Sequence, residues 1–243
     1  MILKSSSSRI VISVIKHIVL IGMLGFLFYV FFGAYENLEA LYNTFGKDYF
    51  SRYAEAETGS KNLVTSILLD YRLFDSLFEA GILLIAVSGV IWISRHEIEE
   101  KNAQFMIDKF KTPDLFVTFS RLVYPLMLAF GFYVIINGHL SPGGGFQGGA
   151  IVATAILILY YIDAEKDTNI NLIVTVEKYI YIAILLLATA SYFTRGAFFT
   201  NVFPLESSAD AKSIYLVVLN VLIGFKVALG LWAIFTAFLK EGR

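Results

Sequence analysis

Residues 138–150, GHLSPGGGFQGGA, decide how this chain folds, because they place a loose backbone between two long apolar runs. Pro142 and five glycines fall within eight residues of this stretch. Glycine adopts backbone conformations that other residues avoid, and proline removes a helical hydrogen bond. The stretch therefore predicts a tight hairpin between two helices.

A glycine-rich loop can also bind phosphate, but such a loop follows a strand, opens a helix and carries a Lys with Ser or Thr. Those companions are missing here, so we reject nucleotide binding. In the hairpin, Pro142 is expected to end the first helix. Small residues then allow close helix packing, and Gln147 with free backbone amides can polarise a pocket. Packing alone remains the alternative. The hairpin residues are Pro142, Gly143, Gly144, Gly145, Phe146, Gln147, Gly148 and Gly149.

The composition predicts an all-α integral membrane protein. Hydrophobic residues make up 57% of the 243 residues, and the mean hydropathy is +0.70. Each membrane helix satisfies its own backbone in lipid, and a span takes about 20 residues. The chain has no Cys, which excludes iron–sulfur clusters, thiol catalysis and disulfides within it. With three scattered His and a net charge of -1, neither a zinc or haem site nor nucleic-acid binding is expected.

Apolar runs predict about six transmembrane helices. They cover residues 10–34, 63–93, 116–138, 146–162, 172–194 and 213–239. A cleaved signal peptide is the alternative for the first, but its apolar run continues to Phe32 without a clear small-residue cleavage site. We expect a retained helix.

The Lys and Arg residues predict that both termini are cytoplasmic. Residues 94–114 then lie inside, whereas residues 139–145 and 195–212 face outside. The inner loops carry Lys4, Arg9, Arg95, Lys101, Lys109, Lys111, Lys166, Lys240 and Arg243, against Lys47, Arg52, Lys61, Arg195 and Lys212 in the outer loops.

A densely charged segment, SRHEIEEKNAQFMIDKFKTPD at residues 94–114, predicts a boundary between two units. We expect one unit at 1–100 with two transmembrane helices, a linker at 101–114, and a second unit at 115–243 with four. An amphipathic surface helix and a solvated linker are both compatible with the charged segment.

Charges inside the second span carry most of the functional information. Ionisable side chains in a bilayer are costly and usually mark a pathway. On an uninterrupted helix, Arg72, Asp75 and Glu79 share one face and Asp70 points away from Glu79. Arg72 can neutralise one carboxylate, which leaves Glu79 as the best candidate for ion or proton transfer. A structural ion pair that holds helices together is the alternative.

Lys226 lies at the centre of the last span and is its one charge. It is either a relay member, since a buried Lys can lose its proton, or the permanent partner of a carboxylate such as Glu79.

At the hairpin the sequence resembles a known family. LSPGGGFQGGAIVATAILILYY, with RLVYPLMLAFGFYVIINGH before it and NVLIGFKVALGL after it, is similar to the MnhB (MrpB) subunits of Mrp-type cation/proton antiporters. NLVTSILLDYRLFDSLFEAGILLIAVSGV resembles the MbhE-like subunits of membrane-bound hydrogenases and the C-terminal segment of MrpA. Asp70, Arg72, Asp75 and Glu79 fall on its charged positions. Leu73 and Phe78 replace glycines of that pattern, so we expect the local packing to differ while the charges are kept.

The resemblance implies a multi-pass subunit of a prokaryotic cell membrane complex, with other Mrp-type antiporter subunits as partners. It implies no catalytic residues, no cofactor and no enzyme activity in this chain, and a transient Na+ at Asp70, Asp75 or Glu79. Three hypotheses remain open. The chain is an ion-path subunit of a Na+/H+ antiporter, the same module in a redox-driven complex such as a hydrogenase, or a scaffold without ion contact.

Overall fold

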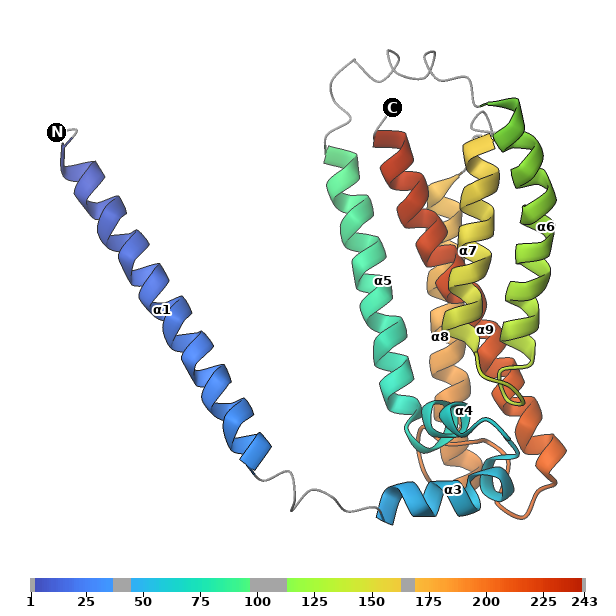
Figure 1. Ribbon diagram of the computed structural model, residues 1–243. Coiled ribbons are helices and arrows are strands. Elements are labelled where there is room, and N and C mark those ends of the chain that lie inside the picture. Colours follow the sequence, from blue (N-terminus) through green and yellow to red (C-terminus); the bar gives the residue numbers. More distant parts are fainter. Residues whose placement is uncertain (1–2, 37–44, 97–112, 163–168, 242–243) are drawn as a thin grey trace. The chain divides into compact units, whose positions relative to one another are not determined.

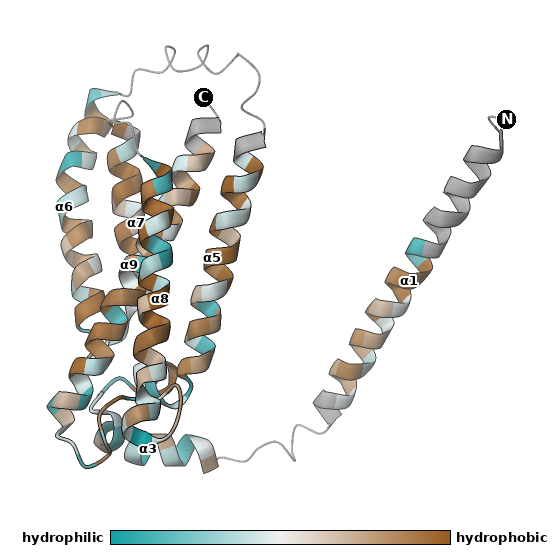
Figure 2. Ribbon diagram, turned by 180° about the vertical axis from the view of Figure 1, so that it is seen from behind, coloured by the Kyte–Doolittle hydropathy of each residue, from teal (hydrophilic) through white to brown (hydrophobic). Residues whose placement is uncertain are grey.

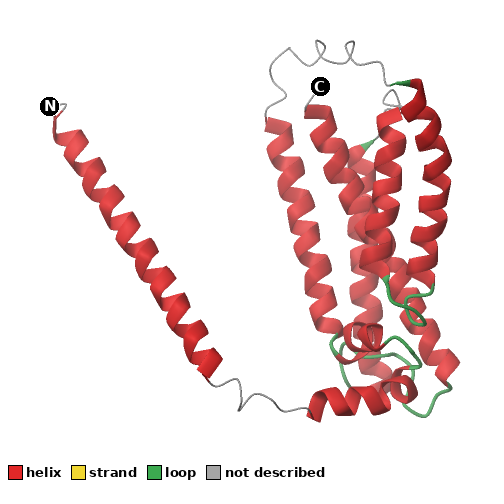
Figure 3. Cartoon of the chain, viewed as in Figure 1, coloured by secondary structure: helices red, strands yellow, loops and turns green. Residues whose placement is uncertain are grey.

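The computed structural model describes residues 3–36, 45–96, 113–162 and 169–241, and every regular element in these ranges is a helix (Figures 1 and 3). The elements are α1 (Leu3–Glu36), α3 (Phe45–Thr58), α4 (Leu63–Ser66), the π-helix η1 (Ile67–Tyr71), α5 (Leu73–His96), α6 (Asp114–Ile136), α7 (Gly145–Ile162), α8 (Ile170–Arg195) and α9 (Ala209–Glu241). The predicted all-helical class is confirmed.

Five helices in the described ranges are long and apolar enough to cross a membrane. They are α1, α5, α6, α8 and α9. The remaining predicted span forms α7, whose apolar part, Gly145–Tyr160, is shorter than the other five. Figure 2 shows hydrophobic residues along the long helices and hydrophilic residues on α3. Which end of each helix faces the cytoplasm stays a prediction.

The chain divides into two compact units, Met1–Asp48 and Tyr49–Arg243. The first contains α1, a single helix whose apolar part is Lys16–Gly33. The second contains the helical bundle. The predicted domain boundary at 101–114 falls mostly outside the described residues, as does the proposed surface helix there.

Helix α9 is the centre of the bundle and packs against α5, α6, α7 and α8 (Figure 1). Its buried face includes Leu216, Leu219, Ile223 and Val227, which meet Ile184 of α8 and the first residues of α5. Apolar side chains gain little by leaving lipid, so such helices associate through close packing. Long continuous contact along α9 therefore holds the bundle together.

The glycine-rich stretch forms the expected hairpin, with one correction. Helix α6 ends at Ile136 rather than at Pro142, and residues 137–144 form the connecting loop before α7 starts at Gly145. Asn137 caps α6, so Pro142 does not end it. Gly143 and Gly144 have φ angles of 141° and 157°, a region that favours glycine.

Two glycines of α7 set its distance from its neighbours. A Cβ on Gly149 would lie 2.6 Å from the carbonyl oxygen of Gly224 in α9. A Cβ on Gly148 would lie 2.8 Å from the carbonyl oxygen of Gly131 in α6. These positions leave no room for a side chain, so α7 is held between α6 and α9 by backbone contact.

The second predicted span is not one continuous helix, which corrects the expected arrangement of its charges. The chain passes through α4 and the π-helix η1, and Arg72 then leaves the helical region with φ -131° and ψ 38°. The Oγ of Ser76 donates a hydrogen bond to the carbonyl oxygen of Leu68 across this break, at 2.7 Å. The premise of one uninterrupted helix from Asp70 to Glu79 is therefore wrong.

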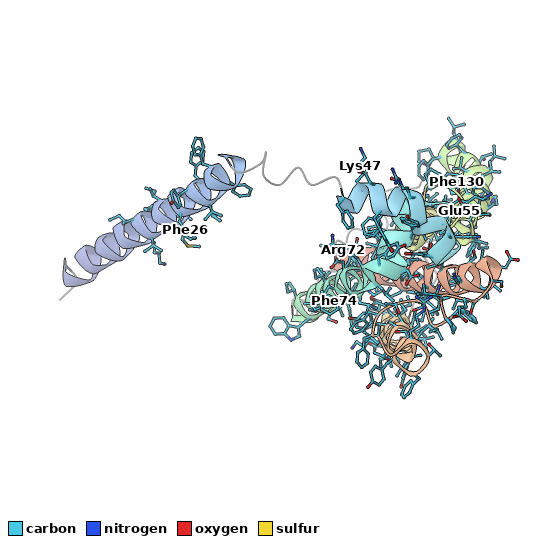
Figure 4. All side chains as sticks on the ribbon, turned by 90° about the horizontal axis from the view of Figure 1, so that it is seen from below. Phe26, Lys47, Glu55, Arg72, Phe74 and Phe130 are labelled. Atoms are coloured by element: carbon cyan, nitrogen blue, oxygen red, sulfur yellow. The ribbon has the colours of Figure 1, made fainter. Side chains whose placement is uncertain are left out.

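Helix α3 lies across one end of the bundle, as Figures 1 and 4 show. The segment after it is tied to the hairpin loop. Asn62 donates from Nδ2 to the carbonyl oxygens of Gly138 and Ser141, at 2.8 and 2.9 Å. Lys212 Nζ, at the start of α9, donates to the carbonyl oxygen of Ala56 at 3.1 Å. The segments predicted to face outside thus share one end, called here the loop end.

The packing of α7 generates a first prediction. Gly149→Val should impair packing of the bundle and therefore assembly of the chain into its complex, because the new Cβ meets the backbone of α9 and cannot move aside. Overpacking of this kind costs about 1–3 kcal/mol. Blue-native gels of membrane extracts would report assembled and unassembled chain.

Gly89→Val on α5 is the matched control, because a Cβ at Gly89 would meet no atom within 4 Å in the described structure. Equal assembly of the two variants would contradict the packing role of Gly149.

Candidate functional site

An ion pair lies inside the bundle, between α8 and α9. The Glu177 Oε1 atom is 3.1 Å from Lys226 Nζ, and both side chains are 0% exposed. Glu177 is about two turns from the start of α8, whereas Lys226 is near the middle of α9. The pair therefore lies away from the loop end.

Small and apolar residues lie beside this pair. Val87 of α5 and Gly230 of α9 pack against it, and a Cβ on Gly230 would lie 2.8 Å from Glu177 Oε1. Apart from the ion pair, neither side chain has a hydrogen-bond partner among the described residues. Two charges removed from water and bonded only to one another are poorly compensated. A proton transfer from Lys226 to Glu177 would remove both charges, so this pair can change its charge state.

Lys226 pairs with a carboxylate, as one of its two expectations held, but that carboxylate is Glu177 and not the suggested Glu79. The sequence did contain a signal for Glu177. It lies at helical spacing from Ile173, Ile184 and Ala188, all of which are buried. Because Lys178 follows it, Glu177 looked like part of the charged edge of a membrane span, and it was therefore not predicted to be buried.

The charged residues at the start of α5 divide into a pair and a single carboxylate. Arg72 Nη2 lies 2.5 Å from Asp75 Oδ2, with side chains 65% and 45% exposed. Such an exposed pair contributes little to stability. Glu79 is exposed and makes no ion pair with any described residue. It borders a small cavity beside the hairpin loop. Arg72 and Phe74, at the start of α5, are labelled in Figure 4.

Asp70 is buried at the loop end, in η1. Its Oδ1 accepts a hydrogen bond from the backbone N–H of Asn201 at 2.8 Å, and Arg195 Nη1 lies 3.9 Å away. Burial raises the pKa of Asp70, and the Asn201 N–H and the Arg195 charge oppose that increase. Asp70 thus anchors the loop after α8, a partner that sequence alone did not indicate.

Glu57 of α3 is a second polar centre that sequence analysis missed. Tyr49 donates a hydrogen bond to its Oε1 at 2.7 Å, and Tyr71 donates a short hydrogen bond to its Oε2. Burial and this bond to Glu57 raise the pKa of Tyr71. The carboxylate therefore joins α3 to η1, next to Asp70.

The three carboxylates proposed for Na+ do not converge. Asp70 contacts the 195–201 loop, Asp75 pairs with Arg72, and Glu79 faces the cavity. The described residues contain no cluster of three or more His, Cys, Asp or Glu placed to hold a metal ion. A bound cation would need carbonyl, amide or hydroxyl oxygens as further ligands.

Comparison with known proteins assigns the C-terminal half. Residues 115–233 match the family described as "Domain related to MnhB subunit of Na+/H+ antiporter". A Staphylococcus aureus protein named as an antiporter subunit, mnhB2, is 46% identical over 43 residues, which make up 18% of this chain and 30% of that protein. An uncharacterized protein of Methanocaldococcus jannaschii is 29% identical over 196 residues, 70% of this chain and 74% of that protein.

Two solved membrane complexes contain chains of similar structure. A chain of the membrane-bound sulfane sulfur reductase, an archaeal respiratory membrane complex, matches with a TM-score of 0.65 and 27% identity, over 89% of this chain and 97% of that chain. A chain of the Mrp complex from Dietzia sp. matches with a TM-score of 0.51 and 25% identity, over 75% of this chain and 22% of that chain.

These matches confirm the MnhB-related domain in residues 115–233. The N-terminal region is related to the M. jannaschii protein and to the sulfane sulfur reductase chain, since those matches extend beyond the MnhB-related domain. The assignment of residues 1–100 as an MbhE-like unit stays a prediction.

The buried pair generates a second prediction. Lys226→Met alone, or Glu177→Gln alone, should lower the free energy of unfolding, and leaving one buried charge unpaired costs about 3–5 kcal/mol. The double variant Glu177→Gln/Lys226→Met should recover most of that loss. Thermal denaturation of the purified complex would measure each variant.

Arg72→Met/Asp75→Asn is the control, because that pair is exposed and its removal should change stability by about 1 kcal/mol or less. Additive losses in the Glu177–Lys226 cycle would mean that the two side chains do not act as a pair.

Proposed function

We propose that this chain is a membrane subunit of a multisubunit ion-translocating complex of the Mrp antiporter type. Glu79 exchanges ions or protons at the loop end, and the Glu177–Lys226 pair carries charge deeper into the bilayer. The chain contributes to the ion path and to assembly, and it is not itself an enzyme. It acts in a prokaryotic cell membrane, beside larger antiporter-like subunits.

The observation that carries this proposal is the buried pair in the MnhB-related domain. A structural role needs only one charge on each helix and would favour a well-bonded pair. Here both oxygens of Glu177 lack hydrogen-bond partners in the described structure apart from the ion pair with Lys226, and Val87 and Gly230 lie beside the carboxylate. Such a pair gains little as an anchor, because an apolar pair of the same shape is often at least as stable. It is suited to switching between charged and neutral forms.

The position of Glu79 near the start of α5 is a second observation that supports the proposal. It lies about two turns into the span that begins at Leu73. A charged side chain at that depth needs water, a bound cation or a partner. A carboxylate with its own cavity and no fixed counter-ion can accept a proton or bind Na+ through its oxygens.

The match to the sulfane sulfur reductase chain favours a second setting for the same module. That chain is covered over 97% of its length by this one, whereas the Mrp complex chain is covered over 22%. We therefore propose a redox-driven respiratory complex as the alternative host. In such a complex, electron transfer on other subunits would power the transport of the ions that an antiporter exchanges.

Purification of the intact complex from native membranes separates these settings. Mass spectrometry should find antiporter-like subunits in both. Subunits with iron–sulfur clusters or flavin would identify the respiratory host. A chain that purifies alone, with no antiporter-like subunit, would contradict the proposal.

The third prediction concerns Glu79. Glu79→Gln keeps the shape and removes the charge, so the complex should assemble while ion movement falls at least about tenfold, a barrier increase of about 1.4 kcal/mol. Vesicles containing the assembled complex would be assayed for Na+-driven proton movement, or for ion movement during electron transfer in a respiratory host.

Glu55→Gln on α3 is the control, because Glu55 is an exposed carboxylate at the same end of the bundle. An assembled Glu79→Gln complex with unchanged ion movement at several pH values would contradict the role of Glu79 and favour the hypothesis of a scaffold subunit without ion contact.

A further inference from the structure

A cavity of about 90 Å³ lies between the start of α5 and the hairpin loop. One side of it is formed by Leu68, Ser76 and Glu79, around the break that follows η1. The other side is formed by Gly144, Gln147 and Asn220. The cavity thus connects the N-terminal region with the MnhB-related domain.

Asn220 is a buried polar residue on the hairpin side of this cavity. Its side chain is 3% exposed, and its Oδ1 accepts a hydrogen bond from the backbone N–H of Gly145 at 2.9 Å. That bond fixes the orientation of the amide, and the Nδ2 has no hydrogen-bond partner among the described residues. A buried donor left without an acceptor costs about 1–3 kcal/mol. Because Asn220 lines the cavity, an acceptor placed in the cavity can satisfy this donor.

The opposite wall of the cavity offers acceptors. Glu79 contributes a carboxylate. Ser76 donates its own hydrogen to the carbonyl oxygen of Leu68, and Thr65 donates to the carbonyl oxygen of Gly138 at 2.6 Å, so both hydroxyl oxygens keep free lone pairs. A ligand that satisfies both walls must accept from Asn220 and donate to these oxygens. A bare cation cannot accept, whereas water does both.

We propose that this cavity holds a cluster of ordered water that joins Glu79 to Asn220. A single water needs about 10–15 Å³ of such space, so the cavity has room for several. Ile223 lies at the cavity wall between Asn220 and Lys226. Lys226 follows Asn220 by six residues, about 9 Å along α9. The water therefore brings protons from Glu79 to within two helical turns of the buried pair, a role that rests on the proposed function.

The glycines of the hairpin keep this space open. A Cβ on Gly144 would lie 3.2 Å from Asn220 Oδ1 and 3.4 Å from Gln147 Oε1. A Cβ on Gly145 would lie 2.6 Å from the backbone oxygen of Asn220. A side chain at either position would therefore press on Asn220 or displace it. The sequence GGGFQGG is explained by this cavity as well as by helix packing.

The direct test is the structure of the intact complex by electron cryomicroscopy, at a resolution that shows ordered water. The expected result is water density in this cavity, within hydrogen-bond distance of Asn220 Nδ2 and of Ser76 or Glu79. A well-resolved cavity that is empty, or that contains a lipid chain or a side chain of another subunit, would overturn the proposal.

Asn220→Leu tests the role of that water by a second route, because leucine has a similar volume but offers neither the Nδ2 donor nor the acceptor of the Gly145 N–H. We expect assembled complex with less water in the cavity and ion movement reduced about tenfold. Asn171→Leu, at an exposed position near the opposite end of the bundle, is the control. Wild-type ion movement in Asn220→Leu would contradict the transfer role of this water.

The two proposals fail separately. A dry cavity with impaired Glu79→Gln transport would remove the water cluster and keep the proposed function. A water-filled cavity with normal Glu79→Gln transport would keep the water cluster and remove the proposed function.

Discussion

Two opposite charges that meet in the apolar interior, on Glu177 and Lys226, constrain the helices around them. The attraction between them is strong because the medium screens it little, yet each has lost its water. The helices that hold them must therefore keep a short separation, and α8 and α9 do so along a continuous apolar contact. Gly230 allows the close approach, because its missing side chain leaves room for the Glu177 carboxylate. The buried charge of Lys226, which is costly to remove from water, thus lies on the central helix α9.

At the loop end, polar side chains lie next to this apolar interior. The break after η1 turns the start of α5 away from a regular helix and places Ser76 and Glu79 beside the hairpin loop. The hairpin glycines then bring backbone close to Asn220, whose amide reaches both the loop and the cavity. Asp70 binds the 195–201 loop at the same end and holds that loop against η1. Charge that enters at Glu79 therefore faces a small polar space first and the apolar core, with its ion pair, second.

Sequence reasoning predicted the helical class, the hairpin and the MnhB-related half, because these depend on local patterns. Long apolar runs define helices, and clustered glycines define a tight turn. It could not locate the partner of Lys226, because that contact joins residues almost 50 positions apart and no local pattern records it. It also missed the break at Ile67–Arg72, since this stretch contains no Gly or Pro to signal an interruption of the helix. The helical wheel that related Asp70 to Glu79 assumed a regular helix that the structure does not have.

The central claim is that the Glu177–Lys226 pair moves charge rather than only holding helices together. The measurement that tests it most directly is ion movement by vesicles containing the assembled Glu177→Gln/Lys226→Met complex, which keeps the shape of the pair without its charge. We expect normal assembly and ion movement reduced at least about tenfold relative to the parent complex. Normal assembly with the parent rate would contradict this claim and would leave the pair as a structural element.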